Sequence, residues 1–366
     1  MRTLTAPPAD IPWRGGIGTL IGAVQEAGLT GRGGAGFPTW RKLAEVATAD
    51  NPVVIGNAAE GEPASAKDVT LLARNPHLVL DGLQLTAETI GASKCYLYAG
   101  SPAAVSVRQA LAGRADRFPV TVVEAPDTFV AGEESAVVSA VDGRRPVPRD
   151  KPRLLVRDGL LVQNVETLAN VTLIARHGPA WFRRLGTRDE PGTFLATVSG
   201  AATNPGVVEV PIGRPMDEVI QPSEPLQAVL VGGYHGTWLP FDGKPLSQAG
   251  LTAALGAGVL VALPQSCCGV VESARIMTYL AGQSTRQCGP CRLGLPRIAE
   301  LLTEVAQRRA TVSAVHDLHV LAGLVTGRGA CGHPDGGARL LRSSLTTFDR
   351  EIGLHLRGGC SHGRSG

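Results

Sequence analysis

The chain of 366 residues is longer than a typical single domain, contains 43% hydrophobic residues and carries a formal net charge of only +3. These values exclude an intrinsically disordered chain and a polybasic nucleic-acid-binding protein, and they predict more than one domain. Glycine and proline are abundant, at 46 and 26 residues, whereas aromatic residues make up 4%. This mixture favours tight turns and backbone-lined sites over long coiled coils.

The N-terminus lacks the apolar stretch of a signal peptide, and the longest uncharged stretch, residues 251–271, is interrupted by glycine, proline and polar residues. We therefore expect a cytoplasmic chain without a transmembrane segment, peripheral to a membrane only through a partner. The seven cysteines are an odd number in such a chain. They favour reduced thiols or metal ligands over a disulfide framework.

The first half of the chain alternates helix-like and strand-like stretches. Residues 17–29 have the apolar spacing of a helix, and short apolar runs at 53–55, 95–98 and 120–123 are typical of strands. Asn164 is placed to cap a further helix. This alternation predicts an α/β domain built on a parallel sheet.

Beyond residue 190 the pattern changes. Short strands separated by turns dominate up to residue 263, and helical spacing dominates from residue 269 onward. We expect an α/β domain over residues 1–190, a small sheet domain over 191–265 and a helical domain over 266–366.

A glycine-rich segment follows the first predicted helix. Gly31, Gly33 and Gly36 have the spacing G-x-G-x-x-G, but a helix precedes them and Ala59 stands where the dinucleotide fingerprint requires an acidic residue. The segment therefore predicts backbone amides that approach a phosphate or a flavin, with an ordinary glycine-rich turn as the alternative. Lys42, one turn into the next helix, is either a phosphate contact or a solvated lysine.

Two acidic turns accompany this loop. Residues 57–63 follow the strand at 53–55, at the edge where α/β sheets bind ligands. Residues 132–134, Gly-Glu-Glu, enter a helix, and acidic residues at such a position are explained by the helix dipole when they stand alone. Together with residues 164–167 and the glycine loop, the two turns predict one ligand site.

Three cysteines predict a metal centre. Cys288 and Cys291 have a C-x-x-C spacing, and Cys331 follows in a glycine-rich loop. A thioredoxin-type redox pair is disfavoured because the surrounding pattern is helical. The spacing does not separate an iron–sulfur cluster from zinc held with His333 as a fourth ligand.

The other cysteines give weaker signals. We expect Cys267 and Cys268 to pack in the core, as buried free cysteines usually do. Cys95, in a predicted strand, and Cys360, near the C-terminus, carry no functional signal.

Taken in order, these motifs resemble the flavin-bearing, NADH-oxidising subunit of respiratory complex I, which is shared with NAD-reducing hydrogenases and NAD-dependent formate dehydrogenases. The resemblance extends over about residues 15 to 356. The segments that carry it are residues 31–39 with Lys42, residues 57–63 with Lys67 and Asp68, residues 132–134, residues 142–145, residues 164–168, and residues 288–292 with Cys331.

The resemblance implies a Rossmann-like flavin domain, a β-grasp domain of the soluble ligand-binding type, and a helical bundle carrying a 4Fe-4S cluster. It assigns three groups of residues. The FMN contacts are Gly31, Gly33, Lys42, Asn57, Gly132, Glu133, Glu134, Asn164 and Thr167; Phe37, Glu62 and Glu134 face the nicotinamide nucleotide; Cys288, Cys291 and Cys331 hold the cluster.

The implied reaction is hydride transfer from NAD(P)H to FMN, followed by single-electron transfer to the cluster and then to a partner protein. That partner is ferredoxin-like or a membrane reductase subunit. No catalytic acid or base is required, because the cofactors carry the redox chemistry.

The sequence departs from the family pattern at several positions. Thr285 replaces the first cysteine of the cluster motif, which leaves a hydroxyl, His333, Cys267, Cys268 or an open iron site as alternatives for the fourth position. Ala59 removes an acceptor for the flavin, Gln163 and Phe129 replace an asparagine and a tyrosine, and Glu45 replaces an aromatic residue expected near the adenine. Two alternatives follow: a flavin and iron–sulfur relay fed by a reduced protein, and a non-catalytic binding module with structural zinc.

Overall fold

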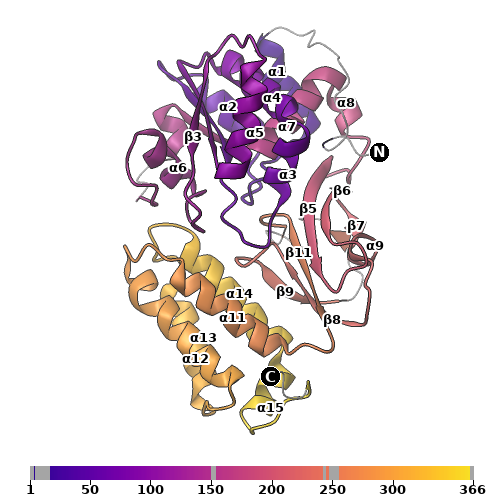
Figure 1. Ribbon diagram of the computed structural model, residues 1–366, viewed down its shortest axis with the longest axis vertical. Coiled ribbons are helices and arrows are strands. Elements are labelled where there is room, and N and C mark those ends of the chain that lie inside the picture. Colours follow the sequence, from indigo (N-terminus) through magenta and orange to yellow (C-terminus); the bar gives the residue numbers. More distant parts are fainter. Residues whose placement is uncertain (1–3, 5–16, 150–153, 242–244, 247–254, 363–366) are drawn as a thin grey trace. The chain divides into compact units, whose positions relative to one another are not determined.

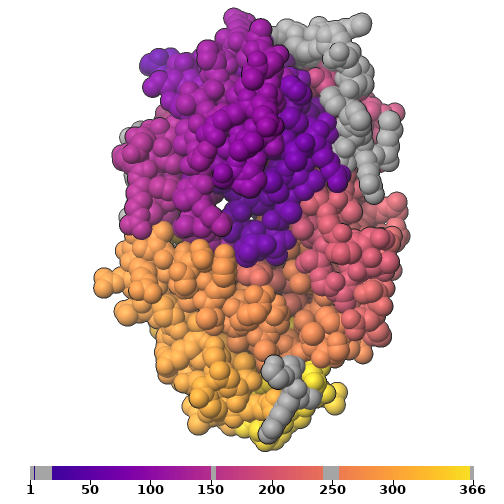
Figure 2. Space-filling view, viewed as in Figure 1, coloured from indigo at the N-terminus to yellow at the C-terminus, as the bar shows by residue number. Residues whose placement is uncertain are grey.

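The computed structural model describes residue 4 and residues 17–149, 154–241, 245–246 and 255–362 (Figure 1 and Figure 2). The chain forms two units. The first unit comprises residues 1–197, 207–214 and 245–253, and the second comprises residues 198–206, 215–244 and 254–366. The division into three domains at residues 190 and 265 stays a prediction.

Four parallel strands form the sheet of the first unit, in the order β3-β2-β1-β4. They are β1 (Val53–Ala58), β2 (Lys94–Ala99), β3 (Val120–Glu124) and β4 (Leu160–Asn164). The chain runs outward from β1 to β3 and then returns to place β4 on the other side of β1. The strand order therefore reverses at β1, and the carboxyl ends of β1 and β4 border the position where such sheets bind ligands.

Helices connect these strands and confirm the α/β alternation predicted from the sequence. They are α1 (Ile17–Ala27), α2 (Thr39–Val46), α3 (Lys67–Arg74), α4 (Pro76–Ile90), α5 (Ser101–Ala112), α6 (Glu134–Val141), α7 (Val165–His177) and α8 (Pro179–Phe182), with a short 3-10 helix, η1 (Leu155–Asp158).

Helix α7 is the buried centre of this unit, since every residue from Val165 to Ala175 is buried. It packs closely on α4 (Figure 1). Gly82 permits this approach, because a Cβ atom added there would lie 2.0 Å from the carbonyl oxygen of Leu168. The close packing fixes the N-terminus of α7 beside the end of β1.

The second unit contains an antiparallel sheet and helices. In the sheet, β8 (Leu226–Val231) pairs with both β9 (Thr237–Pro240) and β11 (Val259–Pro264). The helices are α11 (Gly269–Gly282), α12 (Leu295–Ala306), α13 (Ser313–Val325), α14 (His333–Thr347) and α15 (Asp349–His355), and a π turn, η2 (Pro290–Gly294), leads into α12.

The remaining elements are short or lie near the boundary between the units. They are β5 (Thr193–Gly200), β6 (Gly206–Pro211), β7 (Arg214–Pro215), α9 (Met216–Ile220) and β10 (Pro245–Leu246). Among the residues that the structure describes, no helix is long and apolar enough to cross a membrane. Part of the uncharged stretch at residues 251–271 forms β11 and the start of α11, and its first four residues lie outside the described residues.

Candidate functional site

A cavity of about 430 Å³ lies in the first unit, where β1 and β4 end. This volume is in the range of small-molecule and cofactor sites. The cavity is lined by residues from the glycine loop, α2, the two acidic turns and the β4–α7 junction: Gly31, Gly33, Ala35, Gly36, Phe37, Lys42, Asn57, Gly132, Glu133, Glu134, Leu154, Leu155, Val156, Leu160, Val162, Gln163, Asn164 and Thr167.

All nine residues that the resemblance assigns to FMN are in this lining, and so is Phe37. Glu62 is not in it; the residue is buried, and its Oε1 accepts a hydrogen bond from the amide of Ala64 at 3.1 Å. The structure therefore brings together residues that are more than 130 positions apart in the sequence.

The glycine loop is closed on itself and held against α7. The amide of Gly31 donates to the carbonyl of Phe37 at 2.9 Å, and the amide of Arg32 donates to Thr167 Oγ1 at 2.9 Å. The loop needs glycine at Gly34 and Gly36, where φ is +110° and +60°. Thr167 thus has a direct structural role, which is to fix the loop at the first turn of α7.

The side chain of Arg32 anchors the loop from below. Its Nε donates to the carbonyl of Thr193 at 3.1 Å, and its Nη1 donates to Thr30 Oγ1 at 2.8 Å. Burial lowers the pKa of this guanidinium, and the carboxylates of Glu166 and Glu190 oppose that shift. The arginine therefore stabilises the cavity wall without lining the cavity.

Asn57 joins the two acidic turns. Its Nδ2 donates to the carbonyl of Gly132 at 2.9 Å, and its Oδ1 accepts from the amide of Ala59 at 3.1 Å. The turns touch so closely that a Cβ atom at Gly132 would lie 2.5 Å from the carbonyl oxygen of Ala59. Because its side-chain amide is used in this way, Asn57 shapes the cavity.

The adjacent glutamates of the Gly-Glu-Glu turn have different partners. Glu133 caps α6, since its Oε2 accepts from the amides of Ser135 and Ala136 at 2.9 and 3.2 Å. Glu134 forms an ion pair with Lys42, which reaches it from α2. The side chain of Glu134 is 43% exposed and that of Lys42 is 19% exposed, so this ion pair lies where a ligand can meet it.

A buried ionic cluster lies behind the cavity, around Lys67. Its Nζ contacts Asp68 Oδ1 at 2.7 Å, Glu166 Oε2 at 3.0 Å and Asn164 Oδ1 at 3.3 Å. Burial alone would lower the pKa of Lys67, but the carboxylates of Asp68, Glu166 and Glu60 outweigh it and raise the pKa above its ordinary value. Lys67 is therefore a permanent buried cation.

Asn164 connects this ionic cluster to the cavity wall. As the sequence predicts, it caps α7, because its Oδ1 accepts from the amide of Glu166 at 3.0 Å. Its Nδ2 donates to Asp68 Oδ2 at 2.7 Å, and its backbone pairs with that of Asn57 in the sheet. Lys67 and Asp68 had no assigned role in the sequence, although their position directly after the first acidic turn was a signal for one.

Glu60 holds the start of α3 beside the same cluster. Its carboxylate accepts from the amides of Asp68 and Val69, each at 3.2 Å. Burial raises the pKa of Glu60, and the negative charge of Asp68 raises it further, while Lys67 opposes the shift. The first acidic turn is thus fixed at both ends.

Gln163 is the one cavity-lining residue with a buried polar atom that has no hydrogen-bond partner among the described residues. The atom is its Nε2, and the residue is only 4% exposed. A buried donor without a partner is costly unless a ligand supplies an acceptor. Sequence reasoning noted Gln163 as a departure from the family pattern but gave it no role.

Part of the cavity wall was not foreseen from the sequence. Leu155 and Val156 of η1, with Leu160 and Val162 of β4, supply apolar surface. The segment before η1, residues 150–153, lies outside the described residues. The apolar wall is suited to an aromatic ring system, whereas the glycine loop and Lys42 are suited to an anionic group.

The three cysteines of the predicted metal centre come together in the second unit. Cys288 precedes η2, Cys291 lies within it, and Cys331 precedes α14. Burial and the neighbouring thiols of Cys288 and Cys331 raise the pKa of Cys291 to about 12. The three thiols are therefore close enough to interact.

His333 does not complete this centre. Its Nε2 contacts the carbonyl of Leu280 at 2.9 Å, and its Nδ1 contacts Nε2 of His235 at 3.0 Å. Since both ring nitrogens have these partners, the expected zinc site with His333 as the fourth ligand is not supported. The family position occupied by Thr285 has a hydroxyl that accepts from Gln287 Nε2 at 3.1 Å.

The adjacent cysteines Cys267 and Cys268 differ in their surroundings. The expectation of core packing was wrong for Cys267, which is exposed. Cys268 is buried as expected, but its Sγ lies 3.4 Å from Nε2 of His355, which is a polar contact. Cys360, which carried no signal in the sequence, belongs to the same polar group.

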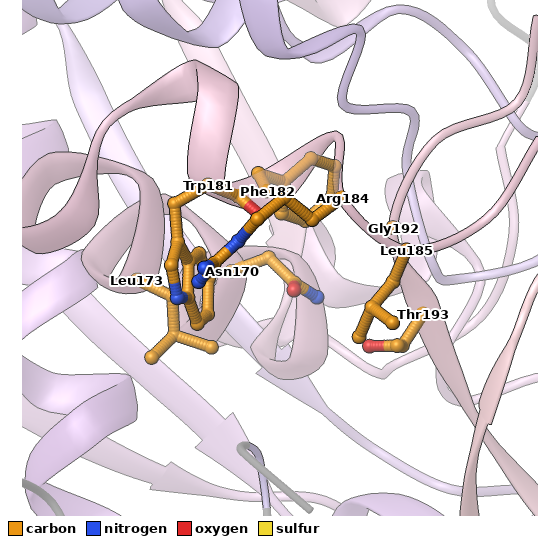
Figure 3. Close-up of a pocket in the computed structure, with 8 residues that line it drawn as sticks. All are labelled: Asn170, Leu173, Trp181, Phe182, Arg184, Leu185, Gly192 and Thr193. Carbon is orange, nitrogen blue, oxygen red and sulfur yellow. The ribbon is translucent and has the colours of Figure 1, made fainter. Parts of the chain in front are cut away.

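A second, smaller cavity of about 180 Å³ lies in the first unit and contains none of the predicted site residues (Figure 3). It is lined by Asn170, Leu173, Trp181, Phe182, Arg184, Leu185, Gly192 and Thr193. Trp181 stacks on His177 with the ring centroids 4.5 Å apart. The lining is mostly apolar and lacks the anion-binding elements of the larger cavity.

Comparison with known families gives two matches. A family described as the Nuo51 FMN-binding domain matches residues 24–173, and one described as the NADH-ubiquinone oxidoreductase-F iron-sulfur binding region matches residues 272–355. The first range contains the cavity, and the second contains the three cysteines.

Individual proteins show the same similarity. The chain is 31% identical to the second F subunit of the NADH-quinone oxidoreductase of Rhizobium meliloti, over 92% of this chain and 88% of that protein. It is 27% identical to the HndC subunit of the NADP-reducing hydrogenase of Solidesulfovibrio fructosivorans, over 97% of this chain and 78% of that protein. In a crystal structure of an air-oxidised NAD+-reducing NiFe-hydrogenase, one chain is 31% identical and superimposes with a TM-score of 0.89. The match covers 96% of this chain but only 66% of that hydrogenase chain.

The ionic cluster behind the cavity gives a testable prediction. Lys67→Met leaves the carboxylates of Asp68 and Glu166 buried without a cation, and we expect the free energy of unfolding to fall by about 3–5 kcal/mol at neutral pH. The loss should shrink in acid, because the two carboxyls, without their cation and in a buried place that raises their pKa values, then become neutral. Urea unfolding at several pH values measures both effects.

The matched control is Lys42→Met, measured in the same way without added flavin. Its partner Glu134 is partly exposed, so we expect a loss of at most about 1 kcal/mol. Equal losses for the two variants would contradict the structural role given to Lys67.

Proposed function

Since this chain belongs to the family of F subunits of NADH-quinone oxidoreductases, we propose that it oxidises a nicotinamide nucleotide through FMN and passes electrons singly to a 4Fe-4S cluster and on to a partner protein. One observation carries the proposal. Nine residues assigned to FMN by family resemblance, from five separate segments, line a single cavity of the size of a cofactor site.

The residues of the cavity fit FMN. The amides of the glycine loop and the N-terminus of α7 favour an anionic phosphate, and the glycines leave no side chains in its way. Leu155, Val156 and Val162 offer apolar surface to a ring system, and the unpartnered Nε2 of Gln163 offers a hydrogen bond to one of its acceptors. Lys42 supplies positive charge on the opposite wall.

The bound flavin supplies the redox chemistry, because it accepts a hydride from a reduced nicotinamide and releases electrons one at a time. The residues of this chain position the two ligands and tune their surroundings. Asn57, Asn164 and Thr167 set the shape of the cavity through hydrogen bonds with the glycine loop and the acidic turns. The cation of Lys67, behind the wall, balances the buried carboxylates so that they do not repel the anionic ligands.

For the nucleotide, Phe37 and Glu134 are the residues that the cavity supports. Phe37 is 39% exposed and lines the cavity, so its ring is available to stack on a nicotinamide or an adenine. The ion pair of Glu134 with Lys42 gives the same wall a polar group for the ribose hydroxyls. Glu62 does not line the cavity, and we propose for it only the positioning of the turn in which it lies.

Cys288, Cys291 and Cys331 would hold three irons of the 4Fe-4S cluster. Their grouping at the start of α12 and α14 fits a cluster, and the engagement of both ring nitrogens of His333 weakens the alternative of a zinc-binding module at this place. The resemblance also supports a β-grasp sheet and a helical bundle for the second unit. The partner that accepts the electrons is, in our proposal, a ferredoxin-like protein or a membrane reductase that tethers this chain to a membrane.

The reaction itself is tested by stopped-flow mixing. Protein purified without oxygen and reconstituted with FMN, iron and sulfide should lose its flavin absorbance on mixing with NADH, because hydride transfer reduces the flavin. NADPH in a parallel experiment gives the nucleotide preference, and free FMN is the control. An absence of bleaching with either nucleotide would reject the dehydrogenase proposal and favour a relay fed by a reduced protein.

The unpartnered amide of Gln163 predicts a specific effect on flavin affinity. Gln163→Met removes a donor that has no partner in the described protein, and we expect FMN to bind about two- to tenfold more weakly, as for the loss of about 0.5–1.5 kcal/mol. Flavin fluorescence quenching measures the Kd, and thermal unfolding of the flavin-free variant should show no loss of stability.

The matched control is Gln227→Met, a half-buried glutamine of the second unit, which should leave the Kd for FMN unchanged. If both variants bound FMN as the wild type does, the amide of Gln163 would not face the flavin.

The departure at Thr285 gives a prediction for the cluster. Thr285→Cys restores the family spacing Cys-x-x-Cys-x-x-Cys with Cys288 and Cys291, so we expect the variant to retain about four irons per chain during exposure to air, as a cubane cluster held by four thiolates does. We expect the wild-type protein to lose iron faster under the same conditions.

Iron and acid-labile sulfide, assayed over time, compare the two proteins. Ser284→Cys is the control, since it adds a thiol one residue away from the required spacing. Equal iron loss in Thr285→Cys and the wild type would show that residue 285 is not at the open position.

A further inference from the structure

Four side chains that the proposed function does not use gather at the C-terminal end of the second unit. They are Cys268, Glu351, His355 and Cys360, and one ligand atom of each lies within 4.8 Å of those of the other three. Among the described residues, this is the only set of three or more such side chains with that property. We propose that these four residues bind a Zn²⁺ ion.

The four residues come from three places in the chain. Cys268 is the residue before α11, Glu351 and His355 are one turn apart on α15, and Cys360 lies in the turn that follows α15. The i, i+4 spacing on α15 places Glu351 and His355 on one face of the helix. The ion would therefore join the start of α11 to the last helix and to the segment after it.

The hydrogen bonds of His355 direct one ring nitrogen into the group. Its Nδ1 lies 3.0 Å from the carbonyl oxygen of Val305, which accepts hydrogen bonds only, so Nδ1 carries the proton. Its Nε2 lies 3.4 Å from Sγ of Cys268 and 3.3 Å from Oε1 of Glu351. This is the arrangement of a metal-binding histidine, in which a backbone carbonyl fixes the ring and the other nitrogen presents its lone pair.

Glu351 is held in a similar way. The amide of Ser361 donates to its Oε1 at 3.0 Å, and the hydroxyl of Ser361 donates to its Oε2. These donors orient the carboxylate toward the ring of His355, as donors around a metal-binding carboxylate do. Without a cation, the lone pair of Nε2 and the carboxylate oxygen would face each other in a buried place, which is unfavourable.

The chemistry of the donors selects the ion. Two sulfur atoms, one imidazole nitrogen and one carboxylate oxygen are ligands that Zn²⁺ takes in tetrahedral sites, whereas Mg²⁺ and Ca²⁺ prefer oxygen ligands throughout. Cys268, Glu351 and His355 are all buried, so four closed protein ligands leave no open position for a substrate. The site is therefore structural.

A structural ion has an evident task here. Helix α15 has seven residues, too few to be stable by itself, and it packs on α11, α12 and α14. An ion bound by α15, by the residue before α11 and by Cys360 would add its binding free energy to the folding of this end of the chain. The site shares no residue with Cys288, Cys291 and Cys331, so it does not rest on the proposed iron–sulfur cluster.

The test is a metal analysis of the full-length protein after removal of loosely bound ions by dialysis. We expect one zinc per chain in the wild type, and its loss in Cys268→Ser and in Cys360→Ser. Cys267→Ser is the matched control, because Cys267 is the adjacent cysteine and is exposed. It should keep its zinc, and the iron content should be the same in all four proteins.

A spectroscopic measurement on the wild type keeps the proposal testable if the variants do not fold. After chelation and addition of Co²⁺, a tetrahedral site with thiolate ligands should give strong ligand-field absorption and thiolate-to-cobalt charge transfer. Chelation should also lower the midpoint of thermal unfolding, and Zn²⁺ should restore it.

Three outcomes would overturn the proposal: absence of zinc from the wild type together with no tetrahedral cobalt spectrum, retention of zinc in Cys268→Ser, or loss of zinc in Cys288→Ser with retention in Cys360→Ser. The last would assign the ion to the other cysteines. None of these results bears on flavin bleaching by NADH, so the failure of this inference and the failure of the proposed function are distinguishable.

Discussion

The buried ammonium group of Lys67 is the interaction on which the larger cavity depends. It contacts the carboxylates of Asp68 and Glu166 and the side chain of Asn164, which together belong to the start of α3 and the β4–α7 junction. Asn164 in turn caps α7 and lies beside Asn57 in the sheet. One buried charge thus fixes the relative positions of segments that a purely apolar core would leave less specifically aligned.

This arrangement separates two tasks among the polar residues. Those behind the cavity, such as Lys67, Glu60 and Arg32, use their charges on the protein itself and set its shape. Lys42, Glu134 and Gln163 line the cavity and keep charge or hydrogen-bonding capacity on its surface. Asn57, Glu133 and Thr167 do both, since they line the cavity and hold its turns together. A family motif therefore mixes residues that touch a ligand with residues that build the place where it binds.

The cysteines of the second unit show a similar separation. Cys288, Cys291 and Cys331 lie at the beginnings of helices, with thiols close enough to influence one another, as a polynuclear cluster requires. Cys268 and Cys360 lie with a histidine and a glutamate in a tighter group suited to a single ion. Six of the seven cysteines are thereby divided between two proposed metal sites and a strand, and Cys267 is the exposed remainder.

The sequence by itself determined the α/β alternation, the cap at Asn164, the site residues of the larger cavity and the three cysteines, because each depends on local spacing or on a motif within a few residues. It did not determine that Lys67 and Asp68 support the site, that Gln163 has an unused donor, or that both nitrogens of His333 are engaged. Nor did it group Cys268 with His355 and Cys360, since their separation of more than 80 positions gives no periodic signal. Those features depend on hydrogen bonds and packing between distant segments, so only the tertiary structure decided them.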